Sequence, residues 1–301
     1  LKKHKPDILV VRYWLPFMGP CLGTILRLVR SNHHTRIICI ADNIIPHEKR
    51  FGDQVWTTYF MKPVQAVITM SEQVEQDLVT HYNKPHLRVT HPLYDLFGEP
   101  ADQTEARNRL QIPVDGNLLL FFGFIRKYKG LDLLLEAMYR LKQNGFLSQH
   151  TLRVLIAGEC YEDIAPYHDL IRTYALEPYI VLHTDFIPDS QVRWYLSAAD
   201  AVIQPYRHAT QSGVTPLAYH FEKPMLVTRV GSLPDFVPAG VGLIVEPNAE
   251  AIAKGIQDLM AEDLGKMQTA IREEKKKYHW QHLTSAIRHL AMGEGKTSGK
   301  I

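Results

Sequence analysis

The 301-residue sequence contains few cysteines, no excess of either charge and no long apolar run. Cys21, Cys39 and Cys160 are far apart and form no CxxC pair, which argues against a structural metal and for a reducing compartment. Lys and Arg number 34 and Asp and Glu number 32, so the net charge of +2 argues against binding to nucleic acid. No apolar segment reaches the ~18 to 20 residues that a membrane-spanning helix needs.

Several catalytic motifs are also absent. No GxGxxG follows a predicted strand, and GxxxxGK[ST], GxSxG and HExxH do not occur. These absences exclude the usual dinucleotide fingerprint, a P-loop and the nucleophile elbow of many hydrolases. No two aspartates stand two positions apart, so a DxD metal clamp is missing too.

Short apolar runs alternate with helical patterns along most of the chain. Continuous apolar strands separated by helices indicate parallel sheets covered on both faces, so we predict an α/β protein with two Rossmann-like lobes. The predicted strands lie at 7–11, 36–40, 64–69, 118–122, 152–157, 180–183, 201–204, 225–228 and 242–245. The predicted helices lie at 22–29, 131–142, 163–175, 189–197, 214–221 and 249–260, with another after the capping residue Ser71.

The composition changes near residues 98–116, where Gly and Pro bracket a small charged helix. We therefore predict a first lobe at 1–112 and a second lobe at 113–262. Helices at 263–292 are expected to pack back on the first lobe, and the Gly-rich end at 293–301 is expected to be disordered. The sequence opens at Leu1 without a methionine, and we expect the first lobe to be incomplete.

Three cations lie at the predicted turn between strand 118–122 and helix 131–142, namely Arg126, Lys127 and Lys129. Cations at a helix N-terminus oppose the helix dipole unless an anion binds there. Ligands of parallel sheets bind at the carboxyl ends of the strands, where this turn falls. The alternative interpretation is a solvated basic loop.

A second polar turn follows the predicted strand 201–204 and contains Ser212, Gly213 and Thr215. Gly213 would let a ligand approach the backbone, whereas a helix cap and a turn glycine are the alternative. Two such turns in one sheet favour a diphosphate ligand. The loops holding Glu159 and Asp185 are interpreted as base and ribose contacts, with ordinary turn roles as the alternative.

The second lobe resembles the donor lobe of GT-B glycosyltransferases of the large retaining family four, also called glycosyl transferases group 1. The resemblance is carried by FFGFIRKYKGLDLLLEA at 121–137, VLIAGE at 154–159, ADAVIQPY at 199–206, KPMLVT at 223–228 and GSLPD at 231–235. It implies that residues 113–262 bind a nucleotide-sugar donor and that the incomplete lobe at 1–112 faces the acceptor.

The resemblance also implies the roles of individual residues. Arg126 and Lys129 are expected to stabilise the departing diphosphate, and Asp42 and His47 lie near the place of a family histidine. The residues expected to bind the donor are Gly123, Gly158, Glu159, Phe186, Ile187, Gln211, Ser212, Gly213 and Val214.

This sequence departs from the family pattern at three positions. The family usually has two glutamates where Ala209 and Leu217 stand here. The usual family arginine, five positions before the lysine, is replaced by Phe124, and Arg126 is expected to substitute for it.

The predicted function is metal-independent, retaining glycosyl transfer in polysaccharide biosynthesis, without a cofactor, from a UDP- or GDP-type sugar to a glycan or lipid-linked acceptor. A cytoplasmic location is expected, with peripheral contact at the inner membrane face as an option. The apolar stretch at 14–20 either packs in the core or contacts an acceptor or a membrane. The alternatives are an inactive sugar-nucleotide-binding module and an epimerase of similar architecture.

Overall fold

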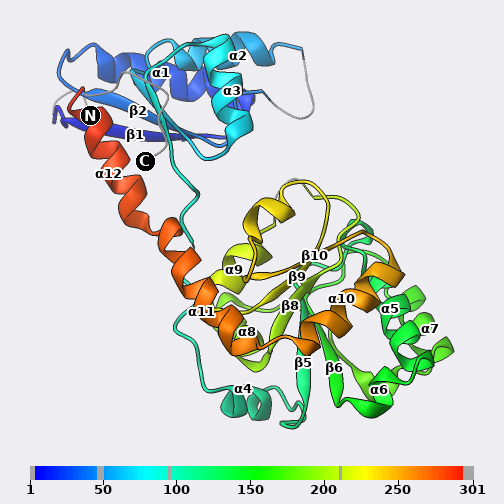
Figure 1. Cartoon of the computed structure of the whole chain (residues 1–301). Helices are drawn as coiled ribbons and strands as arrows, with labels where there is room; N and C mark the ends of the chain where they lie inside the picture. Colours follow the sequence, from blue (N-terminus) through cyan, green and yellow to red (C-terminus); the bar gives the residue numbers. More distant parts are fainter. Residues whose placement is uncertain (1–3, 46–50, 94–95, 210–211, 294–301) are drawn as a thin grey trace. The chain divides into compact units, whose positions relative to one another are not determined.

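The computed structural model describes residues 4–45, 51–93, 96–209 and 212–293. The chain divides into two compact units (Figure 1). The first unit combines Leu1–Pro92 with Lys277–Ile301, and the second unit is Leu93–Lys276. Both contain parallel sheets with helices, so the predicted α/β class is confirmed.

The first unit has a four-stranded parallel sheet of order β1-β2-β3-β4. Its strands are β1 (Ile8–Tyr13), β2 (Arg36–Ala41), β3 (Ala66–Thr69) and β4 (His86–Arg88). The helices are η1 (Pro16–Met18), α1 (Gly19–Arg30), α2 (Asp53–Met61), α3 (Glu72–His81) and α12 (Trp280–Ala291).

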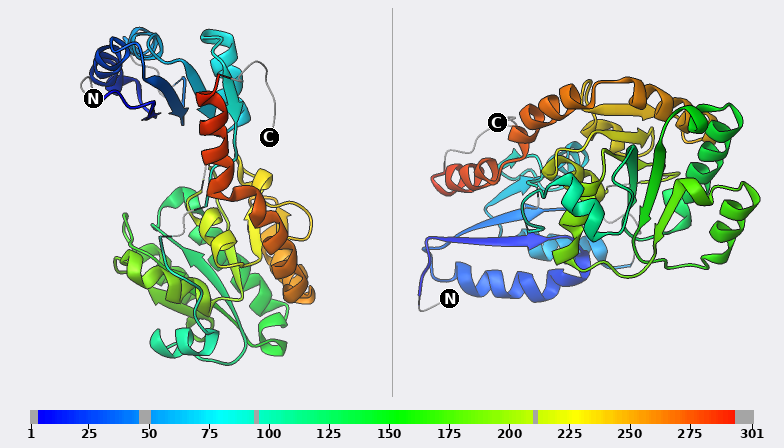
Figure 2. Two further views of the ribbon diagram at one scale, coloured as in Figure 1. Left: turned by 90° about the vertical axis from the view of Figure 1, so that its left-hand side faces the viewer. Right: turned by 90° about the horizontal axis from the view of Figure 1, so that it is seen from below.

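Two apolar cores cover the two faces of this sheet. Helices α1, α2 and α3 pack on one face, where Leu26, Phe60 and Leu78 are buried with β2 residues. Helix α12 packs on the other face through Leu283 and Leu290 (Figure 2). Helix α12, which follows the second unit in the sequence, therefore completes the core of the first unit.

The second unit has a six-stranded parallel sheet of order β10-β9-β8-β5-β6-β7. Its strands are β5 (Asn117–Phe122), β6 (Leu152–Ala157), β7 (Ile180–His183), β8 (Ala201–Gln204), β9 (Met225–Thr228) and β10 (Gly242–Val245). The chain order runs outward from β5 in one direction and from β8 in the other. The carboxyl ends of β5 and β8 thus flank a topological switch point, where open α/β sheets bind ligands.

The helices of the second unit follow its strands, and α5, α7 and α10 share one core with the sheet residues Phe121 and Ile156. The α-helices are α4 (Gln103–Arg109), α5 (Leu131–Gln143), α6 (Phe146–Gln149), α7 (Ala165–Thr173), α8 (Asp189–Ala198), α9 (Val214–His220), α10 (Ala249–Ala261) and α11 (Leu264–Lys275). Short 3-10 turns occur at η2 (Lys127–Lys129), η3 (Glu177–Tyr179), η4 (Leu233–Phe236) and η5 (Lys276–Tyr278).

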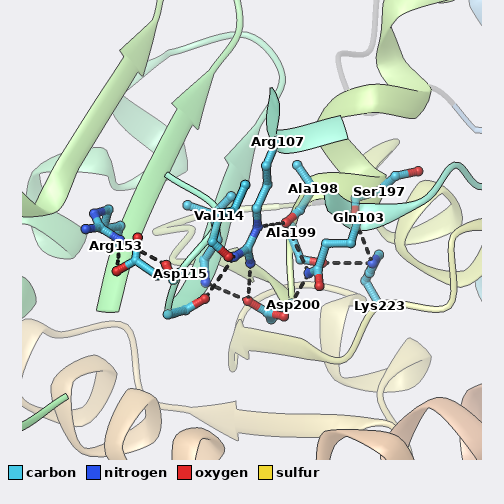
Figure 3. A network of polar contacts seen from close by, with 12 residues as sticks. Gln103, Arg107, Val114, Asp115, Arg153, Ser197, Ala198, Ala199, Asp200 and Lys223 are labelled. Atoms are coloured by element: carbon cyan, nitrogen blue, oxygen red, sulfur yellow. Dashed lines mark hydrogen bonds and ion pairs between the residues drawn. The ribbon is translucent and has the colours of Figure 1, made fainter. Parts of the chain in front are cut away.

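The division between the units falls after Pro92, whereas the sequence predicted a boundary at 112. A polar network explains why α4 belongs to the second unit (Figure 3). Arg107 is buried and donates to the Ala198 carbonyl at 2.9 Å and to Asp200 Oδ2 at 2.8 Å. Asp200 also accepts from the backbone N–H of Leu118 at 2.7 Å, so α4 is tied to the start of β5.

The C-terminal helices, expected together at 263–292, divide between the two units. Helix α11 stays with the second unit, where the Arg272 guanidinium meets Glu222 Oε2 at 2.6 Å and Lys275 donates to the His220 carbonyl. Helix α12 packs on the sheet of the first unit. The predicted tail falls outside the described residues except for Gly293.

Candidate functional site

Lys129 is the centre of the candidate site. It lies in η2, directly after β5 and before α5, and only 8% of its surface is exposed. Among the described residues its ammonium group has no hydrogen-bond or ion-pair partner. Burial, and secondarily the nearby Arg126, lower the pKa of Lys129 to about 8. A buried cation without a counter-ion is costly, and a bound anion would remove that cost.

Arg126 is the second cation of the site. It precedes η2, its side chain is exposed, and its guanidinium carbon lies 4.9 Å from the centre of the Tyr161 ring. Its charge is close enough to lower the pKa of Lys129. Two like charges held together without a carboxylate partner in the described part of the chain form an attractive environment for an anion.

Glycines bring the backbone of the two neighbouring strand ends together. Gly123, with a φ of +89°, follows β5, and Gly158, with a φ of +139°, follows β6. A Cβ atom on Gly158 would clash with the Gly123 carbonyl, and one on Gly123 would lie 3.0 Å from Lys129 Nζ. Gly123 therefore lies beside the lysine and Gly158 lies against Gly123, and side chains at these positions would fill the space.

The turn after β8 is organised by Gln204. Ser212 Oγ donates to Gln204 Oε1 at 2.6 Å and accepts the Val214 N–H at 3.2 Å. Thr215 donates to the same Gln204 oxygen at 3.2 Å. The Ser212 hydroxyl proton is thus used in a hydrogen bond within the protein. In the predicted contact with a nucleotide sugar, Ser212 Oγ could therefore only accept a hydrogen bond.

Gly213 and Val214 occupy different environments at this turn. Gly213 is exposed, and a Cβ atom on it would meet no atom within 4 Å. Val214 is buried and begins α9, and its Cγ2 would lie 3.6 Å from a Cβ on Gly123. Val214 therefore belongs, with Gly123 and Arg126, to the cluster around Lys129. Gly213, which precedes Val214 in the chain, borders open space.

Exposed aromatic side chains follow three of the strands. Phe124 and Tyr128 follow β5, Tyr161 follows β6 and Phe186 follows β7. Burial of such rings normally stabilises a protein, whereas these rings are exposed after the carboxyl ends of strands, where parallel sheets bind ligands.

Two further predicted residues follow β6 and β7. Glu159 is half-buried, and a hydrogen bond with its carboxylate raises the pKa of the Tyr161 hydroxyl. Ile187 is half-buried next to the exposed Phe186. All these residues belong to loops at the same edge of the second sheet.

Two of the predicted residues, Asp42 and His47, belong to the first unit. Asp42 follows β2, and Arg12 binds both its carboxylate oxygens, at 2.7 and 2.9 Å. His47 and Gln211 lie outside the described residues. At the two places of the family glutamates, Ala209 is half-buried and Leu217 is buried.

Sequence reasoning did not single out Tyr206 and Tyr161. The Tyr206 ring centre lies 5.5 Å from Lys129 Nζ, and burial raises the pKa of Tyr206, which keeps it neutral. Tyr206 follows β8 at the switch point, so its position in the sequence could have identified it as a site residue. The stacking of Tyr161 on Arg126 could not be predicted from any pattern in the sequence.

The turns after β5 and β8 are held together by direct bonds. The Arg207 guanidinium donates to Asp132 Oδ2 at 2.6 Å, and the Arg207 N–H donates to the Tyr128 carbonyl at 2.7 Å. A Cβ atom on Gly130, whose φ is +68°, would clash with the Pro205 carbonyl. The two turns that flank the switch point are therefore one rigid assembly.

The described residues hold no group of three His, Cys, Asp or Glu side chains arranged to bind a metal ion. None of the helices that they form has the length and apolar character needed to cross a bilayer.

The comparison with solved structures shows the fold. The Anabaena protein HepE in complex with UDP has a TM-score of 0.68 at 14% identity, covering 97% of this chain and 79% of its own. Sucrose-phosphate synthase from Thermosynechococcus elongatus has a TM-score of 0.64 at 18% identity, covering 95% and 73%. These likenesses confirm the predicted α/β architecture of GT-B type.

Curated relatives are glycosyltransferases. A D-inositol 3-phosphate glycosyltransferase of Mycobacterium leprae is 27% identical over 233 residues, which are 73% of this chain and 52% of the relative. An uncharacterized glycosyltransferase of Methanocaldococcus jannaschii is 25% identical over 296 residues, covering 93% and 73%. The chain spans about half the length of the first of these relatives.

The family model described as Glycosyl transferases group 1 matches residues 102–278. The match contains every described residue of the cluster around Lys129, together with α4 and α11. The segment is more than half of the sequence, and this chain belongs to the glycosyl transferases group 1 family.

Proposed function

We propose that this protein transfers a sugar from a nucleoside diphosphate sugar and that the cluster around Lys129 binds the diphosphate. The single observation that carries the proposal is the buried Lys129 side chain, whose ammonium group has no hydrogen-bond or ion-pair partner among the described residues. Arg126 supplies a second charge, and the first N–H groups of the 13-residue helix α5 supply a third attraction. All three come from the carboxyl end of β5, beside the switch point.

The chemistry follows from where charge develops. As the bond between the sugar and the diphosphate breaks, negative charge grows on the departing phosphate oxygens. Fixed cations in a site that excludes water stabilise that charge without having to reorganise, and removing one donor of this kind typically costs ~10² to 10³ in rate. The proposal gives this role to Lys129 and Arg126 and does not require a metal ion.

The finer assignments are a UDP-type donor and retention of anomeric configuration. UDP and UDP-glucose are bound in solved structures of HepE, which supports a uridine nucleotide as the donor to test first. Retention is proposed from the resemblance to the retaining family alone. NMR of the product made from an α-linked donor tests it directly.

For the acceptor we propose a glycan or a lipid-linked molecule, reached at a membrane surface. Phe17 and Leu28 on η1 and α1 are exposed, and no carboxylate occurs in the sequence between Asp7 and Asp42. Apolar side chains without nearby negative charge suit an anionic bilayer. Co-sedimentation with vesicles of anionic lipid should exceed that with neutral vesicles, and Phe17→Ser with Leu28→Ser should lower the binding to both.

The decisive experiment compares two lysines of one turn. Lys129→Ala should weaken UDP binding, measured by calorimetry, by at least about tenfold and lower sugar transfer by ~10² or more. Lys127→Ala removes the same charge from an exposed neighbouring position and should change both by less than about twofold. Equal effects of the two substitutions would contradict the assignment of Lys129.

A second candidate function is donor binding without catalysis. Ala209 and Leu217, in place of the two family glutamates, favour it because no carboxylate is supplied at these positions. An assay of UDP-sugar consumption with a panel of acceptors separates the two functions. Binding without consumption would support the binding module, and a rearranged sugar formed without an acceptor would support an epimerase.

A further inference from the structure

The segments that follow β5 and β6 continue side by side beyond the ends of these strands. The Ile125 N–H donates to the Glu159 carbonyl at 2.9 Å, and the Tyr161 N–H donates to the Ile125 carbonyl at 3.2 Å. Ile125 also forms a parallel bridge with Cys160. This short extension fixes residues 124–126 relative to residues 159–161.

The extension places three exposed side chains in contact. The guanidinium of Arg126 lies over the Tyr161 ring, 4.9 Å from its centre. Phe124 meets the same ring edge-on, with ring centres 4.8 Å apart and an angle of 77° between the planes. Stacking on an aromatic face restricts a long arginine side chain that would otherwise move freely in solvent.

Tyr161 is itself held at both ends. Its backbone is bonded to Ile125, and its hydroxyl is close enough to the Glu159 carboxylate for that group to raise the pKa of Tyr161. The Lys127 N–H donates to Glu162 Oε2 at 2.9 Å, which adds a third bond between the two loops. The loop after β6 is therefore a rigid support for the loop that carries the cations.

We propose that Tyr161 is a positioning residue that holds the Arg126 guanidinium beside Lys129, so that both cations meet the diphosphate. The inference rests on the proposed function. It explains how an arginine three positions before the lysine takes the role of an arginine that family members carry five positions before it. Phe124, at the usual arginine position, packs on the supporting tyrosine instead.

The test compares substitutions that keep or remove the stacked ring. Tyr161→Leu should weaken UDP binding about two- to fivefold, the range expected for one exposed cation–π contact. Tyr161→Phe keeps the ring, loses only the hydroxyl and should bind UDP within about twofold of the unmodified protein. Thermal unfolding of both variants shows whether the second unit is still folded.

A double-mutant cycle separates positioning from a general structural effect. If Tyr161 acts through Arg126, the double variant Arg126→Ala with Tyr161→Leu should bind UDP as weakly as Arg126→Ala alone. Additive losses would overturn the positioning role, as would full affinity in Tyr161→Leu. If neither Arg126→Ala nor Lys129→Ala weakens UDP binding, the proposed function itself fails, whatever Tyr161 does.

Discussion

The charge state of Lys129 ties ligand binding to pH. Its pKa of about 8 means that the ammonium is mostly charged at pH 7 and mostly neutral at pH 9. Only the charged form attracts a diphosphate, and a bound diphosphate favours the charged form in return. Binding near pH 8 is therefore expected to take up a proton.

We predict that the Kd for UDP rises between pH 7 and pH 9, approaching about tenfold per pH unit well above the pKa of Lys129. Calorimetry at pH 8 in two buffers of different ionisation enthalpy measures the proton uptake. Lys129→Arg keeps the charge at all these pH values and should remove both the uptake and the pH dependence. Equal proton uptake in that variant would show that another group titrates.

The same burial predicts a stability effect. Folding withdraws the Lys129 ammonium from water without a partner among the described residues, so Lys129→Met should raise the free energy of unfolding at pH 7 by about 1 to 3 kcal/mol. Lys127→Met, on the exposed side of the turn, should change it by less than about 0.5 kcal/mol. Urea unfolding at pH 7 measures both, and a less stable Lys129→Met protein would argue that the lysine has a partner.

The sequence was sufficient to locate the cationic turn, but it did not show which of the three cations is buried at the site. In the sequence, Arg126, Lys127 and Lys129 are three neighbouring cations that nothing distinguishes. Lys129 is buried because Tyr206 and Val214, far along the chain, close around it at the switch point. Such contacts depend on the order of strands in the sheet, which one sequence does not specify.

At the scale of elements, the turn after β5 is held by the glycine that precedes α5. Gly130→Ala places a Cβ atom against the Pro205 carbonyl at a positive φ, and we expect it to destabilise the second unit by about 2 kcal/mol or more. UDP binding should weaken with it. Circular dichroism during thermal unfolding measures the loss of stability, and calorimetry measures the loss of UDP affinity.

Gly213→Ala is the matched control, because its Cβ atom meets open space and its φ of −70° is ordinary. It should keep the free energy of unfolding within about 0.5 kcal/mol. If a ligand approaches this backbone as the sequence predicts, the variant should still bind UDP more weakly. Unchanged affinity would remove Gly213 from the donor site.

The strands of the second unit were predictable because each is a continuous apolar run. Five of them, β6 to β10, have the predicted ends, and β5 begins one residue earlier. Helix α2 was not predicted, because Val55, Thr57 and Tyr59 are residues that favour strands. Its Phe60 and Met61 are buried against the sheet, and packing overrides the local preference.

At the scale of the molecule, the network around Arg107 predicts how the chain can be divided. A fragment of Leu93–Lys276 should unfold in one cooperative transition, because it keeps α4 and its bonds to Ala198 and Asp200. A fragment beginning at residue 113, the boundary expected from composition, should be destabilised by about 3 kcal/mol or more, since Asp200 loses its buried partner. Denaturant titration of the two fragments decides between the boundaries.

Helix α12 has a consequence for the order in which the protein is made. The sheet of the first unit is translated before the second unit, whereas Leu283 and Leu290, which cover Ile38 and Ile68, are translated after it. The second unit has its whole sheet and its main core before that point. During synthesis one face of the first sheet must therefore stay uncovered until α12 has been translated, and an apolar face exposed in this way is a binding site for chaperones.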